Sequence, residues 1–187
     1  MPKLTSPSVW VETYADTLFS YAITRIGERE TAKDLVQETF LSALQGMKTF
    51  RGDSSEKTWL FSILKNKIID FYRRKGTGTA VPSSSLPGST DEDYFFDENG
   101  HWKSDLLPAD WGTMDEVRGN EFLETLQRCL AKLTAQCRGA FTLKYIDELE
   151  SDEVCKELAI SSSNYWVIIH RAKLQLRHCL QKNWLEA

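Results

Sequence analysis

Basic and aromatic side chains are interleaved between residues 57 and 75, and this mixture suits the binding of unpaired nucleic acid. Trp59, Phe61 and Tyr72 lie among lysine and arginine residues there. Unpaired bases stack on aromatic rings while lysine and arginine hold the phosphates. The same pattern also fits an ordinary amphipathic helix whose rings pack in a core and whose charges are solvated. For Trp59, packing in the core is the favoured interpretation.

A second basic cluster lies near the C-terminus, with few acidic residues around it: His170, Arg171, Lys173 and Arg177. It lies on a long helical pattern over about 163–182, which follows a short helical pattern near 151–158 and a tight turn. Short helix, turn and longer helix is a helix-turn-helix, whose second helix enters the major groove of DNA. Arg171 and Lys173 would then contact phosphates or guanine edges.

Three helical patterns in the first half position the first cluster. Apolar residues at helical spacing predict helices over about 9–25, 28–44 and 55–75. Gly27 and Gly46 end the first two, and Ser54 or Ser55 can cap the third. Asp34, Gln37, Glu38 and Thr39 fall on the outer face of the second helix. The predicted core comprises Trp10, Tyr14, Leu18, Tyr21, Ala22, Ala32, Leu35, Val36, Phe40, Leu41, Leu44, Leu60, Ile63, Leu64, Ile68 and Phe71.

Two motifs in this half resemble region 2 of the sigma factors of bacterial RNA polymerase, in the extracytoplasmic-function (ECF) group of the sigma-70 family. Residues 32–40, AKDLVQETF, are similar to the family's A-x-D-L-V-Q-E-x-F segment. The second motif matches in register at Phe50-Arg51-Gly52, Thr58-Trp59-Leu60, Ile63, Asn66, Asp70 and Arg73-Arg74. Many residue types at fixed spacing make this resemblance specific.

The resemblance implies roles for both motifs. The first would dock on the clamp helices of the β′ subunit of core RNA polymerase, through Asp34, Leu35, Gln37 and Glu38. The loop over 47–55 and Asn66 would hold a base flipped out of the promoter −10 element, which needs hydrogen bonds for its edges and a stacking surface. The residues expected at the −10 element are Phe50, Arg51, Asp53, Ser54, Trp59, Asn66, Arg73 and Arg74.

The C-terminal part resembles region 4 of the same family, which reads the promoter −35 element. Arg171-Ala172-Lys173 and Leu176-Arg177 fit the family's R-A-[RK]-x-x-L-R segment. The residues expected at the −35 element are Asn164, His170, Arg171, Lys173 and Arg177. The chain departs from the family where polar residues usually begin the reading helix, because Trp166-Val167-Ile168-Ile169 is apolar. Either an unusual −35 sequence is read, or a protein partner covers this face.

Charge and composition divide the chain into three parts. Residues 1–80 carry 12 Lys/Arg and 9 Asp/Glu, residues 81–120 carry 2 and 9, and residues 121–187 carry 9 and 9. The acidic middle is also rich in proline and serine, and such a composition is typical of a flexible linker. Its aromatic acidic segment, 91–111, has no assigned role beyond the implied passage through positively charged channels of the polymerase.

The remaining features indicate a cytoplasmic protein. The sequence begins with no signal peptide and contains no apolar run of the roughly 20 residues that a membrane span needs. Its four cysteines, Cys129, Cys137, Cys155 and Cys179, lack the paired spacing of a zinc site. We expect them to be reduced, with no metal, no cofactor and no catalytic residue in the chain.

The sequence therefore predicts an all-α protein of two small helical domains, a three-helix region 2 and a four-helix region 4, joined by an acidic flexible linker. The predicted boundaries are 1–76, 77–119 and 120–187. The predicted function is that of a sigma factor, with core RNA polymerase (β′ clamp helices and β subunit), promoter DNA and an anti-sigma factor as partners. The alternatives are a stand-alone helix-turn-helix regulator and an adaptor that has lost DNA binding.

Overall fold

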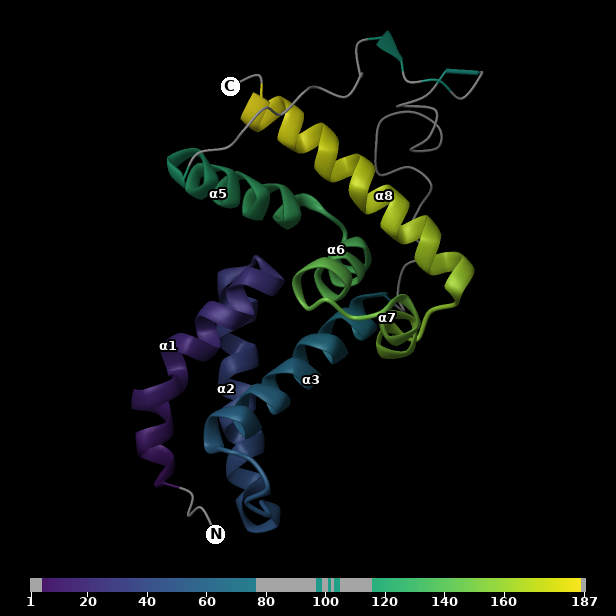
Figure 1. Cartoon of the computed structure of the whole chain (residues 1–187). Helices are drawn as coiled ribbons and strands as arrows, with labels where there is room; N and C mark the ends of the chain where they lie inside the picture. The colour runs from purple at the N-terminus through teal and green to yellow at the C-terminus, as the bar shows by residue number, and fades with distance from the viewer. Residues whose placement is uncertain (1–4, 77–96, 99–100, 102, 105–115, 186–187) are drawn as a thin grey trace. The chain divides into compact units, whose positions relative to one another are not determined.

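The structure, a computed structural model, describes residues 5–76, 97–98, 101, 103–104 and 116–185, without the side chains of 116–120 and 185. Its elements are helical and its contacts divide the chain into two units, residues 1–72 and 73–187 (Figure 1). The predicted all-α class with two helical domains is confirmed. The segment expected to be a flexible linker, including the aromatic acidic stretch 91–111, lies almost wholly outside the described residues.

The first unit is built from α1 (Pro7–Ile26), α2 (Arg29–Gly46) and the greater part of α3 (Glu56–Gly76). Gly27 ends α1 in the left-handed conformation, with φ of 70°, and its amide donates to the carbonyl of Ile23. Glycine reaches this conformation without steric cost, so the chain reverses at once and α2 packs along α1. A single turn of 3-10 helix, η1 (Met47–Thr49), follows α2.

The core of this unit differs from the predicted core at the edges of each apolar stripe. In α3 the buried residues are Leu60, Leu64, Ile68, Ile69 and Tyr72, whereas Ile63 and Phe71 are half-buried. Tyr72, which we expected among the charges, is buried, and its hydroxyl donates to the carbonyl of Arg25. A buried hydroxyl needs such a partner.

The orientation of α2 also departs from the prediction. Thr39 is fully buried instead of lying on the outer face, and its hydroxyl donates to the carbonyl of Leu35 at 2.7 Å. Leu41 and Leu44, predicted as core, are 58% and 43% exposed. Ala43 is buried in their place. The buried side of α2 consists of Ala32, Leu35, Val36, Thr39 and Ala43, and this orientation turns its last leucines toward solvent.

From residue 116 on, the described part of the second unit forms α5 (Glu116–Lys132), α6 (Ala135–Phe141), α7 (Ser151–Leu158) and α8 (Ser162–Leu180). One turn of π-helix follows α6, η3 (Thr142–Ile146), and another follows α8, η4 (Gln181–Leu185). The helix α5 begins at Glu116, four residues before the predicted domain boundary at 120. Thr134 caps α6 by accepting a hydrogen bond from the amide of Cys137.

A buried arginine joins α6 to the end of α5. Arg138 is 8% exposed, and its Nε donates to the carbonyl of Leu130 at 2.7 Å. The last carbonyls of a helix lack partners within the helix and attract positive charge. The core of this unit includes Cys137, Ala140, Leu143, Val154 and Leu158, together with the inner side of α8.

The expectation that all four cysteines are reduced is wrong for two of them. Cys129 of α5 and Cys179 of α8 form a disulfide between residues 50 positions apart in sequence. Cys137 is buried and Cys155 is half-buried, and neither takes part in this disulfide. Burial first, and then the carboxylate of Asp152, raise the pKa of the Cys155 thiol. Sequence spacing could not reveal the bonded pair, because only the packing of α5 against α8 brings them together.

We predict that the Cys129→Ser/Cys179→Ser double variant lowers the free energy of unfolding of the second unit by about 2–4 kcal/mol, because a disulfide restricts the unfolded chain. Hydrogen exchange of the amides of α5 and α8, read by mass spectrometry, measures this unit by itself. Cys155→Ser is the control and should leave the exchange rates unchanged. Equal protection in the double variant and the wild type would contradict a stabilising role for this bond.

Candidate nucleic-acid interface

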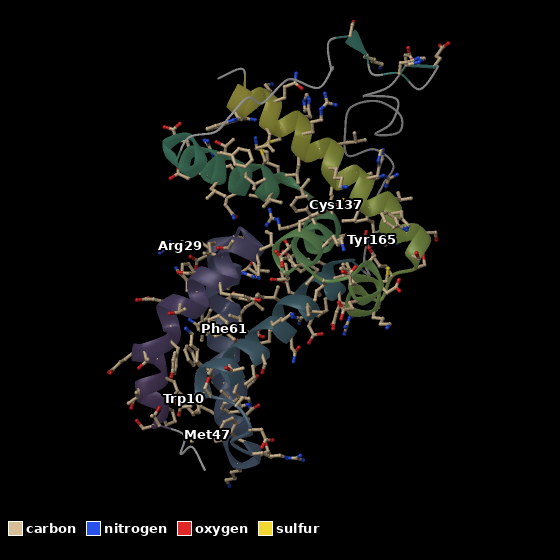
Figure 2. All side chains as sticks on the ribbon, in the orientation of Figure 1. Trp10, Arg29, Met47, Phe61, Cys137 and Tyr165 are labelled. Atoms are coloured by element: carbon tan, nitrogen blue, oxygen red, sulfur yellow. A yellow bond between two sulfur atoms is a disulfide. The ribbon has the colours of Figure 1, made fainter. Side chains whose placement is uncertain are left out.

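An aromatic cluster connects the loop after α2 to the start of α3. The ring of Trp59 lies 4.8 Å from that of Phe50 and 5.9 Å from that of Trp10, between centroids. Trp10 lies near the start of α1 (Figure 2), and its indole donates to Glu56 at 3.2 Å. Gly46 permits this packing, since a Cβ there would meet the Trp59 ring at 3.3 Å. Trp59 is half-buried between Phe50 and Trp10, and its ring therefore supports the loop.

The loop itself presents polar side chains. Gly52 has φ of 78°, which lets the chain turn sharply between the exposed side chains of Arg51 and Asp53. Ser55 begins α3, because its hydroxyl accepts a hydrogen bond from the amide of Thr58 at 3.1 Å. Ser54 is half-buried and makes no such bond to the helix. Of the two serines that the sequence offered as caps, Ser55 is therefore the one that caps α3.

Asn66 is exposed on α3, seven residues after Trp59 and therefore on nearly the same side of the helix, about 10 Å further along. Arg73 and Arg74 follow in the last turn of α3, half-buried and exposed respectively. Of the residues expected at the −10 element, the structure thus places Phe50, Arg51, Asp53, Ser54 and Trp59 around the loop and Asn66 along the helix. Tyr72 is unavailable for stacking because it is buried.

The exposed side of α2 combines polar and apolar residues. Asp34, Gln37 and Glu38 are exposed as expected, and the exposed Leu41 and Leu44 continue the same side toward the end of the helix. Glu38 pairs with Lys67 of α3 at 3.4 Å. Leu35, which we expected to contact the partner, is 3% exposed and belongs to the core. The sequence analysis did not place Leu41 and Leu44 on this surface, because helical spacing alone assigned them to the core.

The helix-turn-helix of the second unit is formed by α7 and α8. Glu150 begins α7: it forms a reciprocal pair of side-chain to backbone hydrogen bonds with Glu153. Ala159 turns the chain in the left-handed conformation, with φ of 53°. The hydroxyl of Ser161 then accepts from the amide of Asn164 at 3.2 Å and begins α8. These local bonds end one helix and begin the next within a few residues.

The inner side of α8 is anchored by Tyr165, Ile168 and Ile169, which are 1%, 1% and 3% exposed. Tyr165 lies near the start of α8 (Figure 2) and its hydroxyl bonds with Ser151 of α7 at 3.2 Å. The outer side carries exposed Asn164, Trp166, Val167, His170 and Lys173.

The last predicted −35 residues are less accessible. Arg171 and Arg177 are half-buried, and burial lowers the pKa of the Arg177 guanidinium from its usual value. This guanidinium remains charged at neutral pH, because the free value of arginine lies far above 7. Lys173 lies with its amine 5.2 Å from the centre of the Tyr145 ring. The structure therefore presents Asn164, His170 and Lys173 most openly.

In the parts of the chain that the structure describes, no three His, Cys, Asp or Glu side chains are grouped so that they could hold a metal ion. No helix among these residues is both long and apolar enough to cross a membrane.

Comparisons with known proteins match both units to one family. The Sigma-70 region 2 model matches residues 10–77, and the Sigma-70 region 4 model matches residues 123–176. A probable RNA polymerase sigma factor of Haemophilus influenzae is 40% identical over 166 residues, which cover 88% of this chain and 84% of the relative.

Two relatives from Bacillus subtilis agree. RNA polymerase sigma factor YlaC is 32% identical over 170 residues, covering 91% of this chain and 89% of the relative. ECF RNA polymerase sigma factor SigX is 29% identical over 167 residues, covering 89% of this chain and 79% of the relative. The chain belongs to the sigma-70 family of bacterial RNA polymerase sigma factors, in its ECF group. It functions as a sigma factor that directs RNA polymerase to promoters.

We predict that Ser55→Ala lowers the free energy of unfolding of the first unit by about 1 kcal/mol, because the first turn of α3 loses its cap. Ser54→Ala is the matched control, since the neighbouring hydroxyl makes no bond to a helix amide, and should change it by less than about 0.5 kcal/mol. Urea unfolding of the two variants measures both values. A larger loss for Ser54→Ala would show that the cap is assigned to the wrong serine.

Proposed function

We propose that residues 1–76 dock on core RNA polymerase and capture the −10 element, and that residues 120–187 bind the −35 element. Polymerase docking and capture of the −10 element use separate surfaces of the first unit. The exposed side of α2 binds the polymerase, whereas the loop over 47–55 and the outer side of α3 bind DNA. The observation that carries this proposal is the mixed surface of α2, in which two exposed leucines continue a row of polar side chains.

The α2 surface suits a rigid helical partner rich in arginine, as the β′ clamp helices of the resemblance imply. Carboxylate and amide groups of Asp34, Gln37 and Glu38 accept hydrogen bonds from guanidinium groups. Leu41 and Leu44 add an apolar patch of the kind that forms the buried centre of an interface. The pair between Glu38 and Lys67 is exposed and therefore weak, so an arginine of the partner can replace the lysine.

The loop and α3 suit a flipped base. Trp59, Phe50 and Trp10 hold the loop against α1 and α3, so Arg51, Asp53 and Ser54 project from a supported backbone. The amide of Asn66 offers both donors and an acceptor to a base edge. Arg73 and Arg74 add positive charge for the phosphates of the same strand.

The second unit suits duplex DNA, since α8 is the second helix of a helix-turn-helix and presents polar and basic residues on its outer side. Asn164 and His170 would reach base edges, and Lys173, Arg171 and Arg177 would contact the backbone. The chain would supply no catalysis of its own and would act in the cytoplasm. An anti-sigma factor would hold it inactive, as the family resemblance implies. A stand-alone regulator is the weaker candidate, because it would need neither the α2 surface nor Asn66.

We predict that Leu41→Ala and Asn66→Ala separate two steps of initiation. Leu41→Ala should weaken binding to core polymerase about tenfold, since it removes a buried apolar contact at the interface centre. At saturating concentrations of this variant, promoter opening should equal that of the wild type. Asn66→Ala should lower open-complex formation about tenfold while core binding stays within twofold of the wild type. Fluorescence anisotropy with core enzyme and permanganate footprinting of the promoter measure the two steps.

The control for Leu41→Ala is Val11→Ala, an apolar residue of α1 that is 49% exposed and lies outside the proposed surfaces. It should leave both readouts unchanged. Equal loss of core binding and opening in Asn66→Ala would count against base capture. A wild-type protein that neither associates with core polymerase nor directs run-off transcription would sink the whole proposal.

We also predict that Lys173→Ala lowers the affinity of holoenzyme for promoter DNA and flattens its salt dependence. Each phosphate contact releases about one counterion, so the slope of log K against log salt should shrink by about 1. Lys132→Ala, which removes an exposed lysine from the end of α5, is the control. An unaltered slope for Lys173→Ala would mean that this residue does not touch the backbone.

A further inference from the structure

Two apolar side chains lie on the exposed side of α8, near the start of the helix. Trp166 is 60% exposed and Val167 is 47% exposed, whereas the neighbouring Tyr165 and Ile168 are 1% exposed each. The exposed pair therefore contributes little to the core of the unit. Large exposed apolar groups that lie together mark a binding surface.

The residues around this pair are polar or basic. Ser163 lies about one turn before it and His170 about one turn after it, both exposed, and Lys173 follows on the next turn. The sequence of α8, SSNYWVIIHRAKLQLRHCL, contains no aspartate or glutamate. A side that bears only neutral and basic groups, at the start of the second helix of a helix-turn-helix, matches the phosphates and base edges of a major groove.

The major groove offers one apolar group that such a pair could contact. The hydrogen-bonding edges of all four base pairs are polar, and only thymine adds a methyl group. We propose that Trp166 and Val167 bind thymine methyl groups of the −35 element, so that this chain prefers A·T pairs at the positions facing them. The proposal rests on the assignment of the second unit to the −35 element, and it names what that unit reads.

DNA explains this surface better than a second protein does, because the basic residues continue directly from the apolar pair. A protein partner that buried Trp166 and Val167 would also cover the exposed ammonium group of Lys173, and burying that charge without an acidic partner would be costly. The indole and the valine methyls can instead pack on thymine while the flanking residues bond to polar edges and phosphates, all within the first four turns of one helix.

The test begins with selection of promoters by holoenzyme from a library randomised at the −35 element. We expect thymine at one or more selected positions. Replacing those thymines by deoxyuridine, which lacks only the methyl group, should weaken holoenzyme binding about threefold to fivefold per methyl. Replacing a selected thymine by cytosine, with guanine opposite, should weaken holoenzyme binding further. Replacing that cytosine by 5-methylcytosine should restore part of the lost affinity.

Variants connect the effect to the protein. The Trp166→Ala/Val167→Ala double variant should bind thymine and deoxyuridine promoters equally. Trp166→Leu should retain part of the preference because it keeps an apolar side chain. Leu123→Ala, which removes an exposed leucine from α5, should discriminate as the wild type does. Thermal unfolding of each variant verifies that the exposed substitutions leave the fold intact.

The outcomes separate this inference from the proposed function. Promoter-specific binding by the wild type with equal affinity for thymine and deoxyuridine would overturn the thymine contact and leave the sigma activity intact. Unchanged DNA binding by Trp166→Ala, with loss of a complex with a purified anti-sigma protein, would assign the pair to a protein partner and also overturn it. A holoenzyme that selects no promoter would refute the proposed function and this inference together.

Discussion

Burial of one side of a helix decides which residues of this protein face its partners. In α3 the buried row of Leu60, Leu64, Ile68 and Tyr72 turns Asn66 outward. In α8 the buried Tyr165, Ile168 and Ile169 turn Trp166 and Val167 outward. Each such apolar side chain contributes about 1.5–3 kcal/mol when fully buried, so rotating either helix by one position would cost several kcal/mol. The proposed contact residues are therefore presented by the core.

Local bonds at the helix starts add a second constraint. Ser55 begins α3 directly after the loop that we assign to base capture, and Ser161 begins α8 directly after the turn of the helix-turn-helix. In the first unit the packing of Phe50 and Trp59 also holds the loop. A flipped base gains most from groups that are already in place, because ordering a flexible loop on binding would consume part of the affinity. In our proposal, the cap at Ser55 and the packing of Phe50 on Trp59 hold the exposed polar groups of the loop ready for a base.

A net charge of −4 is compatible with DNA binding, because charge acts locally at physiological ionic strength. The acidic residues are concentrated in the middle of the chain, and α8 carries none. The acidic residues of α2 have a different role in our proposal, since Asp34 and Glu38 face a protein partner. Each surface then carries the charge that its own partner requires, so the overall charge says little about function.

The positions of the helices, most of their ends and the family followed from the sequence alone, because periodicity, capping and motif spacing are local properties. Asn66, Asp34 and Trp166 were also placed correctly on exposed sides. Tertiary structure alone decided the burial of Tyr72 and Thr39, the exposure of Leu41 and Leu44, and the bond between Cys129 and Cys179. A helix with apolar residues around more than half of its circumference can be turned in several ways, and only its neighbours in space select one. Two cysteines 50 residues apart likewise become partners only when α5 and α8 pack together.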